Sequence, residues 1–362
     1  MNTCLVLGAG ATLANAESFH KIRFESKNPP LDASFFDKIA ALGINVPRQL
    51  RNYAQTSPGL NPFNRRVGQP SPSMEEFFRD LFIDFQETVK GSEIAQAYEQ
   101  LVNIYLRVLR ETTDWIGDGK YTGGSVGRLL ANAAESSETL NVITFNHDLV
   151  IENEIEKRAR LRSRWCLQKG YGKFRDDLSF STSTSTNLFP SHGTSCDHSR
   201  PINVLKLHGS LNWYILMQGR SPSLKILSGT GPTKIVRCTP RRVVPSNLTM
   251  HSKGGRTQYA WPVVVPPIHS KDGFIRKYLT KVWSDADESL RNADRIVFVG
   301  YSMPLLDVNA ERLFRKSIAG NTSVEFIEVV NPAPMAAKRY AELMNTSPLH
   351  WYPNLESYLQ AH

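Results

Sequence analysis

Paired cysteines and long apolar runs are what this sequence most plainly lacks. The cysteines are Cys4, Cys166, Cys196 and Cys238, and none of them forms a C-x-x-C pair. Their scatter disfavours a disulfide framework and a four-cysteine zinc ribbon, so we expect reduced thiols. No apolar run reaches the roughly 18 residues that a membrane-spanning helix needs. The chain opens directly on an apolar strand pattern, which leaves no room for a signal segment. We therefore expect a cytoplasmic protein without a membrane segment.

Metal-ligating residues are also sparse. The closest grouping is His192, Cys196 and His198, which lies in a polar stretch and has no obvious fourth ligand. Structural zinc sites are almost always four-coordinate. We expect no bound metal ion.

Acidic residues are too few to balance the basic ones, and the net charge is +9. Five of the eight residues from Lys157 to Arg164 are basic. Such a run is typical of a solvated helix face, and alternatively of a patch that contacts nucleic acid. The positive excess equally suits a ligand rich in phosphate. Charge alone does not choose among these readings.

Hydrophobic periodicity predicts an α/β fold with a core built from 41% hydrophobic residues. Apolar runs predict strands over residues 4–7, 140–145, 202–207, 295–299 and 324–330. Helical spacing predicts helices behind a capping box at Ser73 and Glu76, and over 93–115, 149–160, 275–290 and 307–318. Alternating strands and helices indicate a doubly wound, Rossmann-like parallel sheet with a helical insertion or second smaller module.

The same patterns suggest how the chain is divided. We expect residues 1–30, 120–160 and 200–340 to form the Rossmann-like domain, with 31–119 as a mainly helical insertion. Residues 161–200 are rich in serine and threonine and read as a flexible excursion. Residues 341–362 form a C-terminal segment.

Four short motifs follow expected strands, at the edge where open parallel sheets bind ligands. They are Gly8-Ala9-Gly10-Ala11-Thr12, Thr144-Phe145-Asn146-His147-Asp148, Leu207-His208-Gly209-Ser210 and Gly300-Tyr301-Ser302. Gly8 and Gly10 allow a pyrophosphate to approach the backbone at a helix N-terminus, where Thr12 adds a hydroxyl donor. Position 13 is Leu, so the G-x-G-x-x-G fingerprint of dehydrogenases is not met.

Each motif also has a plainer interpretation. The first is equally a tight strand-to-helix turn. Asn146 and Asp148 can both face a small polar group such as a carboxamide, or one of them caps the following helix. His208 is suited to act as a general base, or it is a packed histidine at a strand end. The carboxylates Asp307, Glu311 and Glu328 are interpreted as surface or capping residues and receive no catalytic role.

Taken in order, and with Asn331 after the last strand, the motifs resemble those of the sirtuin family. They are most similar to the divergent bacterial sirtuin-like proteins that act as NAD hydrolases in anti-phage defence. The sirtuin patterns GAG-x-S, T-x-N-x-D, H-G, G-x-S and a terminal Asn correspond to Gly8–Thr12, Thr144–Asp148, His208-Gly209, Gly300–Ser302 and Asn331. The resemblance spans residues 1 to about 335.

The chain departs from sirtuin deacylases in two places. It lacks the zinc ribbon of two C-x-x-C pairs, and it has no Asp-Phe-Arg tripeptide between Leu13 and Lys27. In the deacylases the acyl-lysine cleft lies between the Rossmann domain and the zinc-bearing lobe. The absence of the zinc ribbon therefore disfavours a peptide substrate. Cleavage of the nicotinamide bond needs only the remaining parts.

The resemblance implies that NAD is the substrate of an NAD glycohydrolase. Its pyrophosphate would lie over Gly8 to Thr12, and its adenosine half near Gly300, Ser302 and Asn331. Thr144, Asp148 and Gly209 complete the implied cofactor-binding set. The implied catalytic residues are Asn146 and His208, which would position and activate a water to give nicotinamide and ADP-ribose.

Other functions remain open at this point. One alternative is a protein deacylase or ADP-ribosyltransferase that uses the same pocket. Another is a catalytically silent subunit that binds NAD or ADP-ribose as a sensor, and a third is a nucleic-acid-associated subunit that uses the Lys157 to Arg164 run. The resemblance to the defence proteins also implies a role in abortive infection, with an activity that is controlled by assembly. The assembly would be a homo-oligomer or would include a separately encoded partner such as a HerA-type ATPase.

Overall fold

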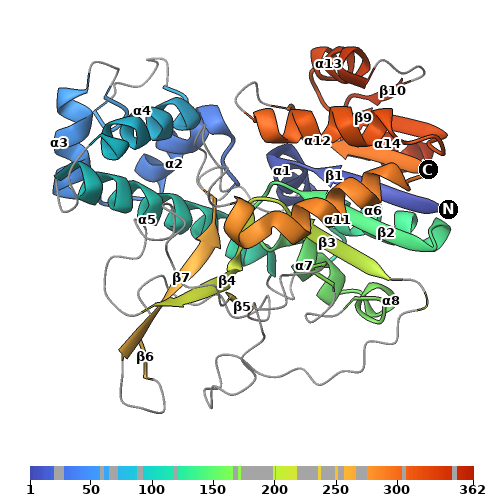
Figure 1. The fold of residues 1–362 in the computed structure, drawn as a ribbon, viewed down its shortest axis with the longest axis horizontal. Coiled ribbons are helices and arrows are strands. Elements are labelled where there is room, and N and C mark those ends of the chain that lie inside the picture. Colours follow the sequence, from blue (N-terminus) through green and yellow to red (C-terminus); the bar gives the residue numbers. More distant parts are fainter. Residues whose placement is uncertain are drawn as a thin grey trace.

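The computed structural model describes most of the chain, and all structural statements concern the described residues. These are residues 1–19, 28–57, 61–64, 72–87, 93–117, 121–165, 170–172, 199, 201–217, 235–237, 249–251, 257–265, 275–303, 307–344 and 349–362. Figure 1 shows three parts: a parallel sheet flanked by helices, a group of helices α2 to α5 beside it, and a small antiparallel sheet.

The main sheet has six strands in the order β10-β9-β8-β1-β2-β3, and every neighbouring pair is parallel. The strands are β1 (Asn2–Leu7), β2 (Thr139–Thr144), β3 (Ile202–Lys206), β8 (Arg295–Val299), β9 (Phe326–Val330) and β10 (Leu349–Tyr352). The chain therefore starts in the middle of the sheet and winds outward in both directions. This confirms the predicted doubly wound α/β fold.

Alternation along β1 divides the core into two layers. Leu5 packs in a cluster with α6 (Ser125–Ser136) and the helical group, whereas Val6 packs in a second cluster with α11 (Thr280–Arg291) and α12 (Val308–Ala319). Successive strand residues face opposite sides of a sheet. Because helices cover both sides, these strands read as continuous apolar runs in the sequence.

The helical group contains η2 (Asp32–Ser34), α2 (Phe35–Ala41), α3 (Arg48–Thr56), α4 (Met74–Gln86), α5 (Glu93–Thr113) and η3 (Asp114–Gly117). The predicted cap of α4 is confirmed, since the Ser73 hydroxyl accepts a hydrogen bond from the backbone N–H of Glu76. Its interior is aromatic, with Phe36, Phe77 and Tyr105 among the buried rings. These aromatics are core residues.

Two predicted helices differ from the structure. The helix expected over 149–160 is broken into α7 (Val150–Glu156) and α8 (Ala159–Arg162), because Arg158 is extended and its guanidinium turns back to the carboxylate and carbonyl of Glu154. The helix expected over 275–290 opens with a π-helical turn, η4 (Ile275–Leu279), before α11 begins.

The remaining elements complete the edges of the fold. They are α1 (Ala9–Glu17), α13 (Pro334–Met344), α14 (Leu355–Ala361), and the antiparallel strands β4 (Gly209–Met217), β5 (Ile235–Arg237), β6 (Thr249–His251) and β7 (Thr257–Val264). The small sheet has the order β5-β4-β7-β6. No helix among the described residues is long and apolar enough to cross a membrane.

Several predictions fall outside the described residues. They concern Cys166, Cys196, Cys238, the His192 to His198 cluster, and most of the 161–200 excursion. Cys4 is described, and it is buried and free. The domain division itself stays a prediction.

Candidate functional site

All four motifs lie at the carboxyl ends of neighbouring strands. Gly8 follows β1, Asn146 follows β2, His208 follows β3 and Gly300 follows β8. Backbone hydrogen bonds extend the ladder past the strand ends, with 3.0 Å from Gly8 N to Val299 O and 2.9 Å from Gly300 N to Val330 O. The motifs therefore emerge at one edge of the sheet.

The glycines of the first and fourth motifs pack backbone against backbone. Gly10 N donates to Gly300 O over 3.0 Å. A Cβ on Gly8 would lie 2.6 Å from Gly300 O, and a Cβ on Gly300 would lie 2.3 Å from Ala11 N. Gly300 also has a φ of +60°, which favours glycine. The lack of side chains at Gly8, Gly10 and Gly300 allows the two loops to contact each other.

The start of α1 keeps one open donor beside this contact. Ala9 is exposed and is the first residue of the helix, so its N–H has no intrahelical acceptor. A helix N-terminus carries a partial positive charge that favours anions. A phosphate group fits this end of α1.

A short chain of hydrogen bonds ties the second motif to the first. The Asn146 amide nitrogen donates to Gly8 O at 2.8 Å and to Thr12 Oγ1 at 2.9 Å. Thr12 then donates to Asp148 Oδ2 at 2.8 Å. The side chains of Asn146, Thr12 and Asp148 are thus held as one unit.

This network fixes what Asn146 presents to a ligand. Gly8 O can only accept a hydrogen bond, so the nitrogen of the Asn146 amide must face it. Both amide protons are engaged, whereas Oδ1 has no partner among the described residues. Asn146 is partly exposed. It therefore offers an oriented acceptor, suited to a water, a ribose hydroxyl or an amide N–H.

Asp148 and Thr144 support the loop. Asp148 Oδ1 accepts from the backbone N–H of Val150, the first residue of α7, at 3.0 Å, whereas the N-cap position of that helix is Leu149. Thr144 is fully buried, donates to Leu7 O at 2.9 Å and accepts from Asn146 N at 3.1 Å. In this structure the Thr144 hydroxyl supports Asn146.

A buried ion pair lies beneath the same loop. Lys206 Nζ donates to Asp148 O and to Glu152 Oε1, the latter at 2.9 Å, and both Lys206 and Glu152 have fully buried side chains. Tyr171 also donates to Glu152 Oε1, at 2.9 Å. Sequence reasoning missed Lys206, although a lysine within an apolar strand before His208 was an available signal.

His208 is held in an aromatic cage at the end of β3. Its ring centroid lies 5.1 Å from Phe145, 6.1 Å from His147 and 6.4 Å from Trp283. Its side chain is 9% exposed, and Nε2 lies 3.6 Å from Asp307 Oδ2. Gly209, the next residue, allows the chain to pass close to the backbone of β7, because a Cβ on Gly209 would lie 2.0 Å from Val263 O.

Asp307 corrects the sequence interpretation of a surface or capping carboxylate. It occupies the N-cap position of α12, yet its side chain makes no capping hydrogen bond and is buried. Instead, Oδ2 accepts from the Tyr301 hydroxyl at 3.1 Å and faces His208. Burial, and then the Asp307 charge, raises the pKa of Tyr301 well above its usual value, so the phenol stays a donor. The only sequence signal for Asp307 was its place just after the fourth motif.

Glu328 also differs from its predicted surface or capping role. It is 2% exposed and lies within β9, where it accepts from Arg295 Nε at 2.6 Å and contacts His362 Nε2 at 2.9 Å. Glu311 is partly exposed and pairs with Arg315 at 2.8 Å, as a surface residue does.

Helix α13 secures the fourth motif. Arg339 Nη1 donates to Ser302 O and Met303 O, each at 2.9 Å, and the Tyr340 hydroxyl donates to Tyr301 O at 2.9 Å. Met303 has a φ of +52°, a strained value for a residue with a side chain. The loop is therefore held in place by three side-chain hydrogen bonds.

The last two predicted binding residues differ in exposure. Ser302 is exposed at this edge. Asn331 is 6% exposed, and its Oδ1 accepts from Ala333 N at 3.0 Å at the start of α13. Asn331 is thus engaged with its own chain in this structure.

The basic run from Lys157 to Arg164 divides into inward and outward groups. Lys157 and Arg158 both pair with Glu154, whose side chain is fully buried. Arg164 donates to the carbonyl groups of Ala134 and Ser137. Arg160 and Arg162 are exposed.

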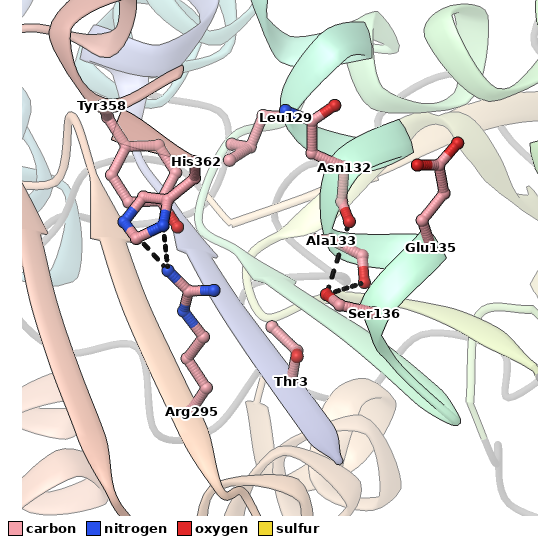
Figure 2. Close-up of a pocket in the computed structure, with 9 residues that line it drawn as sticks. All are labelled: Thr3, Leu129, Asn132, Ala133, Glu135, Ser136, Arg295, Tyr358 and His362. Atoms are coloured by element: carbon pink, nitrogen blue, oxygen red, sulfur yellow. Dashed lines mark hydrogen bonds between the residues drawn. The ribbon is translucent and has the colours of Figure 1, made fainter. Parts of the chain in front are cut away.

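A cavity of about 320 Å³ lies at the opposite, amino edge of the sheet. Figure 2 shows Arg295 and His362 joined on one wall and the end of α6, with Asn132, Glu135 and Ser136, on the other. None of the motif residues lines it. Among the described residues no three His, Cys, Asp or Glu side chains converge as metal ligands.

No protein-family model and no curated protein matches this chain. Among solved structures, it is similar to a Sir2 homologue in complex with NAD, with 11% identity and a TM-score of 0.41 over 99% of this chain and 86% of that chain. It is also similar to Sir2Tm bound to a propionylated peptide, with 11% identity and a TM-score of 0.39 over 99% and 90%. A third similar structure is a Sir2 variant with a deacetylated p53 peptide and 3′-O-acetyl ADP-ribose, at 12% identity and a TM-score of 0.41 over 99% and 90%.

Proposed function

We propose that this chain is an NAD glycohydrolase that uses water to cleave NAD into nicotinamide and ADP-ribose. The observation that carries the proposal is the fixed amide of Asn146, whose Oδ1 has no partner among the described residues and which lies at the same sheet edge as His208. A hydrolase of this kind needs an oriented water and a base. The two side chains are of the types that supply them.

The substrate assignment rests on the chemistry of the same edge. The N-terminus of α1 suits the pyrophosphate, and the net charge of +9 is compatible with a ligand that carries two phosphates. The close contact of Gly8 and Gly10 with Gly300 supports a ligand that spans both loops, as the proposed pose of NAD requires. Ser302 is exposed there to contact the adenosine half.

The reaction balances with water as the only co-substrate. The oxygen of water forms a bond to the anomeric carbon of the nicotinamide ribose, while the bond from that carbon to the pyridine nitrogen breaks. Nicotinamide leaves with the bonding electron pair and becomes neutral. Asn146 Oδ1 accepts a hydrogen bond from the attacking water, and His208 takes the proton that water releases.

The test is NAD turnover by the purified protein, with products identified by chromatography. We expect release of nicotinamide and ADP-ribose without any acceptor. Asn146→Ala and His208→Ala should each reduce the rate on the order of a hundredfold or more. The matched controls are Asn132→Ala and His350→Ala, which change exposed residues of the same types away from the motifs. Full activity in a folded Asn146→Ala or His208→Ala variant would contradict the assignment.

A silent NAD-binding or ADP-ribose-binding subunit is the second candidate. It is favoured by the tight packing of His208, which is 7% exposed among aromatic rings. Binding of NAD in calorimetry without turnover, alone or with a partner, would support this candidate. Consumption of NAD only with an acyl-peptide or another acceptor would instead indicate a deacylase or ADP-ribosyltransferase.

For the biological role, we propose an NAD-depleting effector of bacterial anti-phage defence. Uncontrolled NAD loss harms the cell that makes the enzyme, so the activity requires control by assembly. The proposed assemblies are a homo-oligomer or a complex with a separately encoded partner such as a HerA-type ATPase. Light scattering of the purified chain, with NAD turnover measured for each species, tests the first. Survival of infected cells carrying the chain or its His208→Ala variant tests the role.

A further inference from the structure

We propose that Asp307 is a positioning residue for His208, holding the imidazole in place and stabilising its protonated form during the reaction. This inference rests on the proposed function, in which His208 takes a proton from water. Asp307 is separated from His208 by 99 positions in the sequence, and sequence patterns gave it no such role.

The first argument is the orientation of the Asp307 side chain. An aspartate at an N-cap normally accepts an N–H from the first helical turn, which stabilises the helix by about 0.5–2 kcal/mol. The Asp307 side chain makes no such bond. Its Oδ2 lies 3.6 Å from His208 Nε2, which is too long for a hydrogen bond but close enough to pair with the imidazole once that ring is protonated. The Asp307 side chain therefore contacts His208 instead of capping α12.

The second argument is that the carboxylate is itself fixed. The Tyr301 hydroxyl donates to Asp307 Oδ2 at 3.1 Å. The Tyr301 ring in turn stacks on Phe145, with centroids 4.3 Å apart and planes 9° from parallel. Phe145 also contacts the edge of His208, at 5.1 Å. His208, Phe145, Tyr301 and Asp307 therefore form a closed set of contacts, in which the carboxylate cannot turn away without losing the phenol.

The third argument is electrostatic. The Asp307 and His208 side chains are 6% and 9% exposed, so water and salt screen their interaction weakly. A carboxylate within about 4–6 Å favours the protonated imidazole. Hydrogen bonds in catalytic groups often shorten once substrate binds, so the 3.6 Å contact is compatible with a tighter pair in the complex.

Other ionisable groups surround the pair from several elements. They are His147 and Asp148 after β2, Lys206 at the end of β3, Tyr301 after β8, Tyr105 of α5 facing His147, and Glu75 of α4, whose charge acts on Tyr105 and Tyr301. Lys206 is neutralised by Glu152, and Asp148 is held by Thr12. Among these groups, Asp307 carries the carboxylate that lies 3.6 Å from the His208 ring.

The test compares Asp307→Asn with the wild type in the full chain. Asparagine keeps the shape and removes the charge, so we expect kcat to fall about 10- to 100-fold with little change in KM. The acid limb of the kcat profile should move to lower pH by about one unit, because the pKa of His208 loses the support of a negative charge. Asp307→Glu should recover part of the activity.

The matched control is Glu311→Gln, which removes a partly exposed carboxylate from the same helix. We expect its kcat and pH profile to equal those of the wild type. Tyr301→Phe is a second test, because it removes the hydroxyl that holds Asp307 and keeps the stacked ring. It should give a smaller loss than Asp307→Asn. Should Asp307→Asn fail to fold, Tyr301→Phe and Asp307→Glu still decide the matter.

A second readout does not depend on turnover. The histidine ring signals are titrated by NMR, and His208 is assigned by the signal lost in His208→Gln. We expect the titration midpoint of His208 to fall by about one pH unit in Asp307→Asn and to stay constant in Glu311→Gln. An unmoved midpoint would overturn the inference. If the His208 midpoint falls as expected in Asp307→Asn but the wild type never consumes NAD, only the proposed function is overturned.

Discussion

At the amino edge of the main sheet, Arg295, Glu328 and His362 bond to one another, whereas at the carboxyl edge a hydrogen-bonded network holds a partly exposed Asn146 near the buried His208. Burial disfavours the guanidinium charge of Arg295, but its bond to Glu328 and the neighbouring phenols raise its pKa overall. Its Nη2 also contacts the His362 ring at 3.1 Å. The charges of Arg295 and Glu328 are therefore paired with each other.

The carboxyl edge is organised differently although it uses the same strands. β8 begins at Arg295 and leads to Gly300, and β1 leads from Thr3 to Gly8. There the bonds fix side chains and still leave Asn146 Oδ1 available. The number of charged groups at an edge therefore does not locate a site. An oriented atom without a partner is the better indicator.

The largest effect is expected from the buried lysine under the carboxyl edge. Lys206→Met removes the partner of the fully buried Glu152 carboxylate, and it should lower the free energy of unfolding by about 3–5 kcal/mol. It also releases Asp148 O, so NAD turnover should fall. Urea unfolding measures the first effect. Lys338→Met, an exposed lysine paired with Glu342, is the control and should be neutral. Equal stability of the two variants would contradict the buried pair.

A smaller loss should follow from the glycine contact at the same edge. Gly300→Ala forces a side chain into a φ of +60° and against Ala11 N at 2.3 Å, so we expect about 2–4 kcal/mol. Gly43→Ala is a close match, with a φ of +62° and nothing within 4 Å. It should cost only about 1–2 kcal/mol. The difference in unfolding free energy isolates the contact between the loops. No difference would mean that the loops relax apart.

A substitution at the amino edge should change the stability of the protein but not its NAD turnover. Arg295→Gln leaves Glu328 without its guanidinium, and we expect a loss of about 1–3 kcal/mol, discounted because Arg295 is 17% exposed. The kcat for NAD should stay at the wild-type value. Thermal unfolding and turnover, measured on one preparation, check both statements. A drop in kcat larger than the loss of folded protein would break the contrast between the edges.

The smallest effect is expected at the rim of the amino-edge cavity. The Glu135 side chain is 68% exposed and pairs with Arg160, which is 90% exposed. Glu135→Gln should therefore leave both the denaturation midpoint and NAD turnover unchanged. A change in turnover would show that the amino edge communicates with the site.

Much of the fold could be predicted from the sequence, because buried parallel strands are continuous apolar runs. Strand β8 coincides with its predicted range, and β1 and β2 lie close to theirs. Strand β10 was missed because His350 and Trp351 are exposed on a short edge strand, which breaks the apolar pattern. The break after α7 was missed because it depends on Arg158 reaching Glu154.

The candidate site was less predictable than the fold. Motif order suggested that Asn146 would face a ligand, but its two donors are bound to Gly8 and Thr12, 138 and 134 positions away. Asp148 turned out to serve Thr12 and Val150 with its two oxygens. Asp307 was misread because its N-cap position is visible in the sequence and its partner is not. Such contacts arise only when distant strand ends meet.

The central place of β1 has a consequence for when the protein becomes active during synthesis. Asn2 N bonds to Asp294 Oδ2 across 292 positions, and β1 is flanked by β2 and β8. Strand β1 is therefore made long before its neighbour β8, and contacts of such long range form slowly. A nascent or truncated chain lacks the Gly300 loop against which Gly8 and Gly10 close. The order of translation itself delays a site whose proposed activity would drain the cell of NAD.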